Sequence, residues 1–135
     1  MPKTSDAQLR RQMRAAITAA AAKKAQDPVL LDVRQKAGFC DYFLLCHGAN
    51  PRQIQAIAEA IELALETGGL RPSYREGGRE AEWVVLDYVD FIVHVFSPRT
   101  RRFYDLERLW SPAPRLALPA TVRRALAREA AEQAG

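Results

Sequence analysis

The chain has only two cysteines among its 135 residues, Cys40 and Cys46. A disulfide-stapled scaffold and a zinc site made of four cysteines both need more, so both are excluded. No apolar run approaches the roughly 18 residues that a helix needs to cross a bilayer. The polar, basic N-terminus also lacks the apolar stretch of a secretory signal. We therefore expect no membrane contact and a cytoplasmic protein with reduced thiols.

Familiar catalytic motifs are missing as well: there is no P-loop, no GxGxxG, no HExxH and no GxSxG. Asp87 and Asp90 are the best candidates for a metal-holding carboxylate pair. They flank a predicted tight turn, where Asp commonly accepts local backbone hydrogen bonds, so the turn interpretation is favoured. His94 stands between two valines, and this setting favours a packed, hydrogen-bonded imidazole over a ligand. We expect no catalytic residue, no metal and no cofactor.

Charge is present but unevenly distributed. The net charge of the chain is +4, whereas segment 1–24 carries +5, segment 112–135 carries +2 and segment 25–111 carries −3. Basic ends are typical of contact with nucleic-acid phosphates, and equally of the solvated faces of amphipathic helices. The acidic middle favours a basic protein partner over a nucleic-acid groove.

Hydrophobic periodicity predicts an α/β domain with the order α-β-β-α-β-β-α and a tail. A helix between pairs of strands, with helices at both ends, predicts one mixed sheet covered by helices. The domain is expected to span residues 1–111, followed by a Pro-rich linker and an Arg/Ala-rich helix or flexible tail over 112–135. The expected elements are helices at 9–20, 51–67, 100–110 and 121–133, strands at 29–33, 39–46, 83–88 and 91–96, and a short strand near 73–74.

Local signals set the expected boundaries of these elements. Ser5 or Asp6 is expected to cap the first helix, which ends at Asp27-Pro28, because a residue before proline disfavours helical backbone. Asn50 is expected to cap the second helix and Thr100 a short third one, on which Phe103, Leu106 and Trp110 share a face. The second helix leads to the strand at Trp83. Cys40 and Cys46, six residues apart, are expected as buried or half-buried thiols on one face of one strand.

Strand 83–88 has two largely apolar faces. Alternation places Trp83, Val85 and Asp87 on one face and Val84, Leu86 and Tyr88 on the other. A strand buried on both sides has this pattern, and so does a strand with one face against a partner. Trp and Tyr dominate interface hot spots. Both interpretations stay open for Trp83, Tyr88 and Tyr104.

Several blocks, in order along the chain, resemble the Iojap-like proteins, the ribosomal silencing factor family. The likeness spans about Leu9 to Trp110, and the tail after Ser111 lies outside it. Family members usually carry glycine where Val89 stands. Valine resists positive φ, so we expect this turn to differ. The matching blocks are 27–33, 41–43, 52–58, 76–77, 83–88, Asp90, 93–96 and 102–110.

The resemblance implies a translation factor that is not an enzyme. Family members bind large-subunit ribosomal protein fourteen, block joining of the small subunit and silence translation when nutrients are scarce; organellar relatives assist large-subunit assembly. It also implies a nucleotidyltransferase-like fold and a homodimer. The nucleotidyltransferase active-site pattern is not met, because Gly48-Ala49 replaces Gly-Ser and no Asp-x-Asp occurs. A metal-dependent nucleotidyltransferase using Asp87 and Asp90 is the less favoured alternative.

A partner-binding surface follows as a hypothesis. Aromatic side chains would anchor a basic ribosomal protein, and carboxylates would complement its charge. The bound protein would then exclude the small subunit sterically. Contact of the basic ends with rRNA, in a large-subunit assembly role, is the alternative. The expected partner-binding residues are Trp83, Leu86, Asp87, Tyr88 and Asp90, with rim contacts from Tyr104, Glu107 and Arg108.

Overall fold

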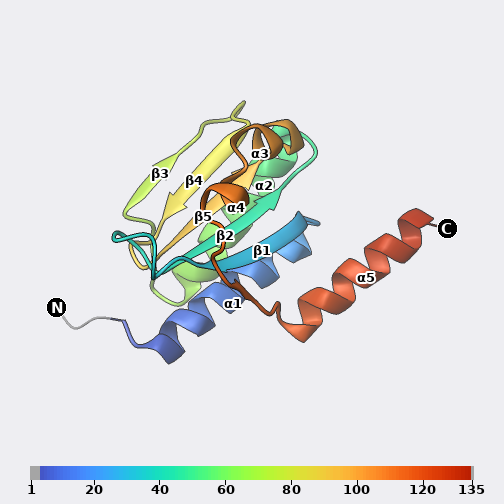
Figure 1. Cartoon of the computed structure of the whole chain (residues 1–135). Helices are drawn as coiled ribbons and strands as arrows, with labels where there is room; N and C mark the ends of the chain where they lie inside the picture. Colours follow the sequence, from blue (N-terminus) through green and yellow to red (C-terminus); the bar gives the residue numbers. More distant parts are fainter. Residues whose placement is uncertain (1–3, 135) are drawn as a thin grey trace.

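The computed structural model describes residues 4–134, so Lys3 of the basic N-terminal segment lies outside it. A six-stranded mixed sheet with the order β3-β4-β5-β2-β1-β6 forms its centre (Figure 1). Only β2 and β5 pair in parallel; the other four pairings are antiparallel. The expected mixed sheet flanked by helices is confirmed. In chain order the elements are α1 (Asp6–Ala22), β1 (Gln26–Asp32), β2 (Tyr42–His47), α2 (Pro51–Thr67), β3 (Tyr74–Glu76), β4 (Trp83–Asp87), β5 (Phe91–Phe96), α3 (Pro98–Tyr104), α4 (Leu106–Leu109), β6 (Arg115–Leu116) and α5 (Ala120–Ala134).

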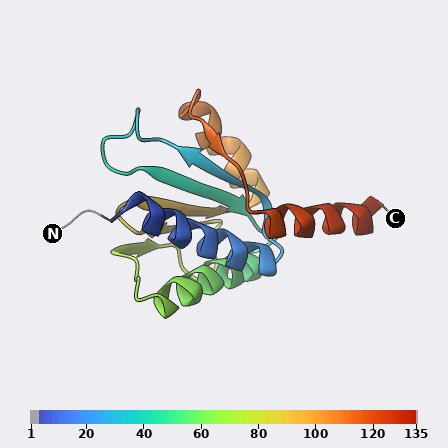
Figure 2. The ribbon, with the colours of Figure 1, turned by 90° about the horizontal axis from the view of Figure 1, so that it is seen from below.

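Helices α1 and α2 lie side by side on one face of the sheet (Figure 2). The Ser5 hydroxyl caps α1 and the Asn50 side chain caps α2, each accepting from a backbone N–H three residues on. Both helices present an apolar stripe to the sheet, and both stripes are buried in a first hydrophobic core between the helices and the sheet. The buried stripe residues are Leu9, Met13, Ala16, Ile17 and Ala20 of α1 and Ile54, Ile57, Ala58, Ile61 and Leu65 of α2.

Short helices cover part of the opposite face. Leu106 and Trp110 pack against a second core formed by side chains of β1, β2 and β5. The expected single helix is wrong in two respects. Ser97, not Thr100, caps α3, and Asp105 adopts a left-handed conformation (φ 45°) that separates α3 from α4. Phe103 consequently points away from this core and is 80% exposed.

The segments joining helices to the sheet differ from expectation. Helix α1 ends at Ala22, and Asp27-Pro28 lies inside β1 rather than closing the helix. One connection does agree: the short strand expected near 73–74 is present as the edge strand β3, through which the chain passes between α2 and β4. The Pro-rich linker adds an edge strand, because Leu116 pairs with Leu30. Among residues 4–134, no helix is both long and apolar enough to span a membrane.

The two cysteines are buried free thiols, as expected, but they do not share a strand face. Cys40 precedes β2 and belongs to the core beneath α4, whereas Cys46 belongs to the core beneath α1 and α2. Alternation along one strand did not apply, because β2 begins at Tyr42 and Cys40 lies outside it. Burial raises the pKa of each thiol to about 12, which keeps both protonated at neutral pH.

Candidate functional site

Within residues 4–134, no helix covers one part of the sheet face on which α3 and α4 lie (Figure 1). Helices α3 and α4 lie over the β5, β2 and β1 side of this face, and β3 and β4 extend beyond them (Figure 1). Strand register puts Tyr74 opposite Asp87 and Glu76 opposite Val85, so alternate residues of β3 and β4 line the same surface. We name Tyr74, Glu76, Trp83, Val85, Asp87 and Tyr104 the open sheet face. All six are at least partly exposed.

Trp83 lies at one end of the open sheet face, where β4 begins. Its indole Nε1–H donates to Nδ1 of His94 at 3.1 Å. Its ring centroid lies 4.8 Å from that of Tyr104 and 5.0 Å from that of Phe96. The ring therefore joins the uncovered strand to the end of α3 and keeps a partly exposed surface.

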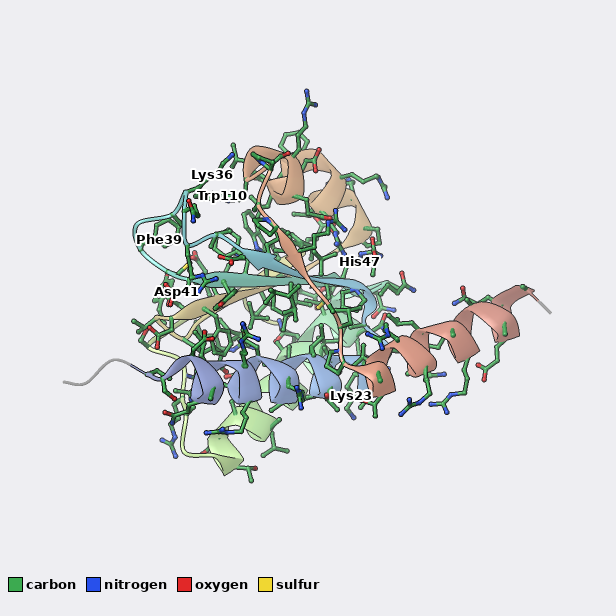
Figure 3. The ribbon with its side chains drawn as sticks, turned by 60° about the horizontal axis from the view of Figure 1, so that its bottom comes forward. Lys23, Lys36, Phe39, Asp41, His47 and Trp110 are labelled. Carbon is green, nitrogen blue, oxygen red and sulfur yellow. The ribbon has the colours of Figure 1, made fainter. Side chains whose placement is uncertain are left out.

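An aromatic chain continues from Trp83 under α4. His94 and Trp110 both contact the ring of Phe43 edge-on, at 5.1 and 5.4 Å. Trp110 in turn meets Phe39, which is 60% exposed in the loop before β2 (Figure 3). The expectation of a packed, hydrogen-bonded imidazole at His94 is confirmed, with Trp83 as its donor.

Two of the expected partner-binding residues lie in the core. Leu86 is 0% and Tyr88 4% exposed, and both face α1 and α2 on the opposite side of β4 from Trp83. The Tyr88 ring stacks on Phe91 with centroids 5.0 Å apart, and burial raises the pKa of its hydroxyl. Leu86 and Tyr88 are therefore core residues in this structure and are not available for direct contact with a partner.

Asp87 and Asp90 lie in the hairpin between β4 and β5. The Asp87 carboxylate accepts from the backbone N–H of Val89 at 2.8 Å, which is the local turn bond that Asp commonly makes. Val89 itself adopts φ 71°, so the expectation that valine would avoid this conformation is wrong. The carbonyl of Asp90 accepts from the N–H of Asp41, tying the hairpin to the start of β2. Within the described residues, no three His, Cys, Asp or Glu side chains group closely enough to hold a metal ion.

The expected rim residues come from α3 and α4 and have different environments. Tyr104 is 51% exposed and Arg108 is exposed. Glu107 is mostly enclosed, and its carboxylate accepts from Arg101 Nε at 3.0 Å and from Arg115 Nη2 at 3.1 Å. The Glu107 charge is thus paired with two arginines of the same chain.

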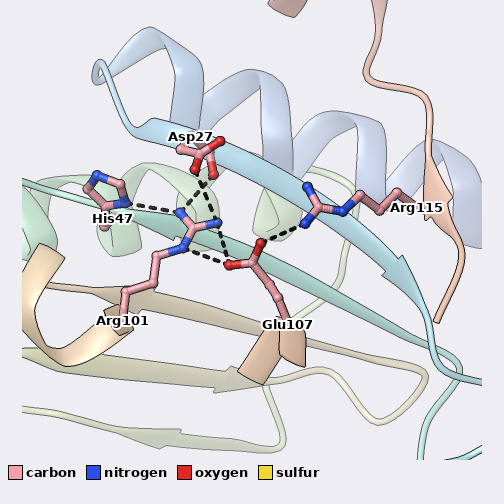
Figure 4. A network of polar contacts seen from close by, with 5 residues as sticks. All are labelled: Asp27, His47, Arg101, Glu107 and Arg115. Atoms are coloured by element: carbon pink, nitrogen blue, oxygen red, sulfur yellow. Dashed lines mark hydrogen bonds and ion pairs between the residues drawn. The ribbon is translucent and has the colours of Figure 1, made fainter. Parts of the chain in front are cut away.

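Arg101 is a buried residue that the sequence did not single out. Its Nη1 donates to the backbone oxygen of Asp27 at 2.7 Å and to Nδ1 of His47 at 3.0 Å (Figure 4). Because the guanidinium only donates, His47 accepts through Nδ1 and is neutral. Burial and the Arg101 charge both lower the pKa of His47. This network fastens α3, which carries Tyr104, and α4 to β1, β2 and β6.

Tyr74 and Glu76 were also missed as site residues. A short strand was expected near 73–74, but three residues are too few to show which of its faces joins the site. The Tyr74 hydroxyl donates to the Glu76 carboxylate at 3.1 Å. Only the register of β3 against β4 shows that Tyr74 lies opposite Asp87 and Glu76 opposite Val85.

The family model described as ribosomal silencing factor during starvation matches residues 6–135. The chain belongs to the ribosomal silencing factor family. The match includes the C-terminal segment after Ser111, which carried no recognisable block in the sequence. The ribosomal silencing factor of Bacillus subtilis is 42% identical over 92 residues, covering 68% of this chain and 78% of that protein.

Solved structures agree with this family assignment. A crystal structure from Bacillus halodurans is 35% identical, with a TM-score of 0.71, and the match covers 81% of this chain and 99% of that one. A more distant relative, at 26% identity over 66% of this chain and 40% of its own length, is the mouse protein named mitochondrial assembly of ribosomal large subunit protein 1. Silencing factors and an organellar large-subunit assembly protein are thus both similar to this chain.

Proposed function

We propose that this silencing factor binds the large ribosomal subunit through large-subunit ribosomal protein fourteen and sterically blocks joining of the small subunit. It would repress cytoplasmic translation when nutrients are limiting, without any chemical step. The observation that supports this proposal is the open sheet face, where aromatic and acidic side chains lie together on a side of β3 and β4 that no helix of the described residues covers.

The composition of the open sheet face suits a basic protein partner. Trp83, Tyr104 and Tyr74 supply large, partly exposed rings of the type that anchors interfaces. Glu76 and Asp87 add negative charge beside them, which complements a basic surface and speeds encounter. The expected set of contacts is accordingly revised: Leu86 and Tyr88 support the face from beneath, and Tyr74 and Glu76 join it.

A subunit-joining assay tests the proposal. Purified large and small subunits are mixed with the protein, and assembled particles are measured by sedimentation. The test variant is Glu76→Lys, which reverses an exposed charge on the open sheet face. The matched control is Glu59→Lys, the same exchange at an exposed position of α2 on the other side of the sheet.

The unsubstituted protein and the control are expected to reduce joining to the same extent. Replacing an attraction with a repulsion at a partly solvated contact changes binding by about 1.4 kcal/mol, so Glu76→Lys should need about ten times more protein. Equal potency of the two lysine variants would exclude the open sheet face as the docking surface. Undiminished joining at saturating protein would exclude the silencing mechanism.

A second candidate function, large-subunit assembly through rRNA contact, is favoured by one further observation. The two basic ends of the chain meet, because α5 packs on α1 through the buried Val122. Lys24 and Arg128 line one groove of about 360 Å³ between these helices, although Glu129 and Glu132 line it too. Arg10 and Arg14 line a neighbouring groove beside β6. Exposed Lys and Arg so placed suit phosphate contacts.

Point variants test this second candidate better than deletion of the ends, because residues 115–116 belong to the sheet. Arg14→Glu combined with Lys24→Glu should weaken binding to a large-subunit rRNA fragment and reduce the dependence of log Kd on log salt by about 2. Arg99→Glu, at an exposed position of α3 away from both grooves, is the control. Equal salt dependence in all variants would argue against the basic surface.

The homodimer stays a prediction. The apolar stripe of α2 is enclosed in the core of one chain, so it is not available as a dimer contact. Mass measurement by light scattering across a concentration series is the test, and a monomeric mass at all concentrations would refute it.

A further inference from the structure

The indole of Trp83 has one polar group, its N–H, which donates a hydrogen bond to a buried histidine. Register pairs Trp83 with Phe96 and Val85 with His94, which makes Trp83 and His94 diagonal neighbours on the same face of β4 and β5. The indole Nε1–H lies 3.1 Å from Nδ1 of His94. Indole only donates, so His94 Nδ1 must be the acceptor.

This contact fixes the protonation of His94. With Nδ1 accepting, the single ring proton of the neutral imidazole lies on Nε2, an atom that is buried without a hydrogen-bond partner in the described structure. The other tautomer, or the imidazolium, would bring two N–H groups face to face. Burial also lowers the pKa of His94 to about 4, so the ring is neutral at physiological pH.

The imidazole is itself held in place. His94 is 8% exposed, and its ring stacks at 8° on Phe96 and meets Phe43 edge-on at 80°. Phe96 of the same strand and Phe43 of the neighbouring strand β2 therefore limit the rotation of the imidazole. The hydrogen bond then transmits this rigidity to Trp83, whose ring touches Tyr104 on the exposed end of α3.

We propose that His94 is a positioning residue for partner docking: the neutral imidazole beneath the open sheet face holds the Trp83 indole in one orientation before the partner arrives. The inference rests on the proposed docking function. An anchor that is already ordered loses less conformational freedom on binding, so the complex is tighter than with a mobile indole. Tyr104, which packs on Trp83, is ordered by the same contact.

Two substitutions separate positioning from packing. His94→Phe keeps an aromatic ring of similar size and removes the acceptor. His94→Asn removes most of the ring but keeps an acceptor near the position of Nδ1. The measurement is the affinity of each variant for purified large-subunit ribosomal protein fourteen, together with its thermal stability and the NMR resonance of the Trp83 indole proton in the free protein.

A positioning role predicts that affinity and stability rank the variants differently. The His94→Phe variant should be the more stable of the two, yet bind about three- to tenfold more weakly than the unsubstituted protein, with an upfield shift of the indole proton. The His94→Asn variant should be less stable but bind within about twofold. In a Trp83→Phe background, which lacks the indole N–H, His94→Phe should change the affinity no further.

Contrary outcomes are specific. Affinities that follow stability, or a His94→Phe effect that persists in the Trp83→Phe background, would show that His94 acts only through packing and would overturn the inference. Failure of the unsubstituted protein to bind protein fourteen, with the indole proton still hydrogen-bonded, would instead overturn the proposed function and the docking role with it.

Discussion

The buried guanidinium of Arg101 predicts a large asymmetry between two arginines that share one carboxylate. Arg101 is 8% exposed, and it contacts Glu107, the backbone of Asp27 and His47. The side chain of Arg115 contacts the other oxygen of Glu107 and is 62% exposed. Arg101→Met keeps an unbranched apolar chain and removes every polar contact.

The magnitude follows from what each substitution leaves behind. Arg101→Met leaves a mostly enclosed carboxylate with one solvent-exposed partner and two acceptors without their donor, so we expect a loss of about 3 kcal/mol in the free energy of unfolding. Arg115→Met removes a largely exposed ion pair and should cost about 0.5 kcal/mol. Urea denaturation at pH 7, followed by circular dichroism, measures both.

A double substitution identifies the mechanism. If the unpaired Glu107 charge is the main penalty, Arg101→Met combined with Glu107→Gln should be more stable than Arg101→Met alone, with a coupling of about 1.5 kcal/mol. Equal costs for the two arginine substitutions, or strictly additive effects of Arg101→Met and Glu107→Gln, would refute the view that this network fastens α3 and α4 to the sheet.

Three further predictions concern stability. Val89→Gly should stabilise the protein by about 1 kcal/mol, because it relieves a β-branched residue at φ 71°; a loss of stability in thermal melts would contradict this. Leu86→Ala should lower the free energy of unfolding by about 3 kcal/mol, and Val85→Ala on the partly exposed face should lower it by about 1 kcal/mol. Equal losses measured by urea denaturation would contradict the assigned burial. Burial lowers the folded pKa of His94 to about 4, so the unfolded chain takes up this proton first as the pH falls. The part of the free energy of unfolding that depends on a neutral His94 is complete above about pH 6.5 and is lost as the pH falls toward 4. Between pH 7 and pH 5 the free energy of unfolding should therefore fall by about 2 kcal/mol more in the unsubstituted protein than in His94→Phe. Parallel pH profiles would contradict this.

Elements with strong local signals were predictable from the sequence. Strand β5 begins and ends where the apolar run 91–96 does, and α2 begins at the Asn50-Pro51 signal and ends just before Gly68. Strand β6 was not predictable, because two residues between prolines carry no periodicity and pair only because β1 offers a free edge. The αL residue Asp105, which divides α3 from α4, likewise has no distinctive sequence signal.

The candidate site was predictable only in part, because a local pattern shows which residues share a face but not which face is covered. Period-two alternation separated Trp83, Val85 and Asp87 from Val84, Leu86 and Tyr88 correctly. It carried no information on which set would be covered, since both are largely apolar. That outcome depends on where α1, α2, α3 and α4 lie, which is a matter of tertiary packing.

The position of α3 and α4 therefore defines the open sheet face as much as β3 and β4 do. A shift of these helices toward β4 would cover Trp83, and a shift away would expose the Phe43 and His94 rings of the second core. The contacts of Arg101 oppose both shifts, because they join α3 to β1 and β2 and, through Glu107 of α4, to Arg115 of β6. A buried ion network is weak as a source of stability compared with apolar packing. Its value in this fold is geometric: it holds the covering helices at the boundary where the partly exposed indole of Trp83 begins.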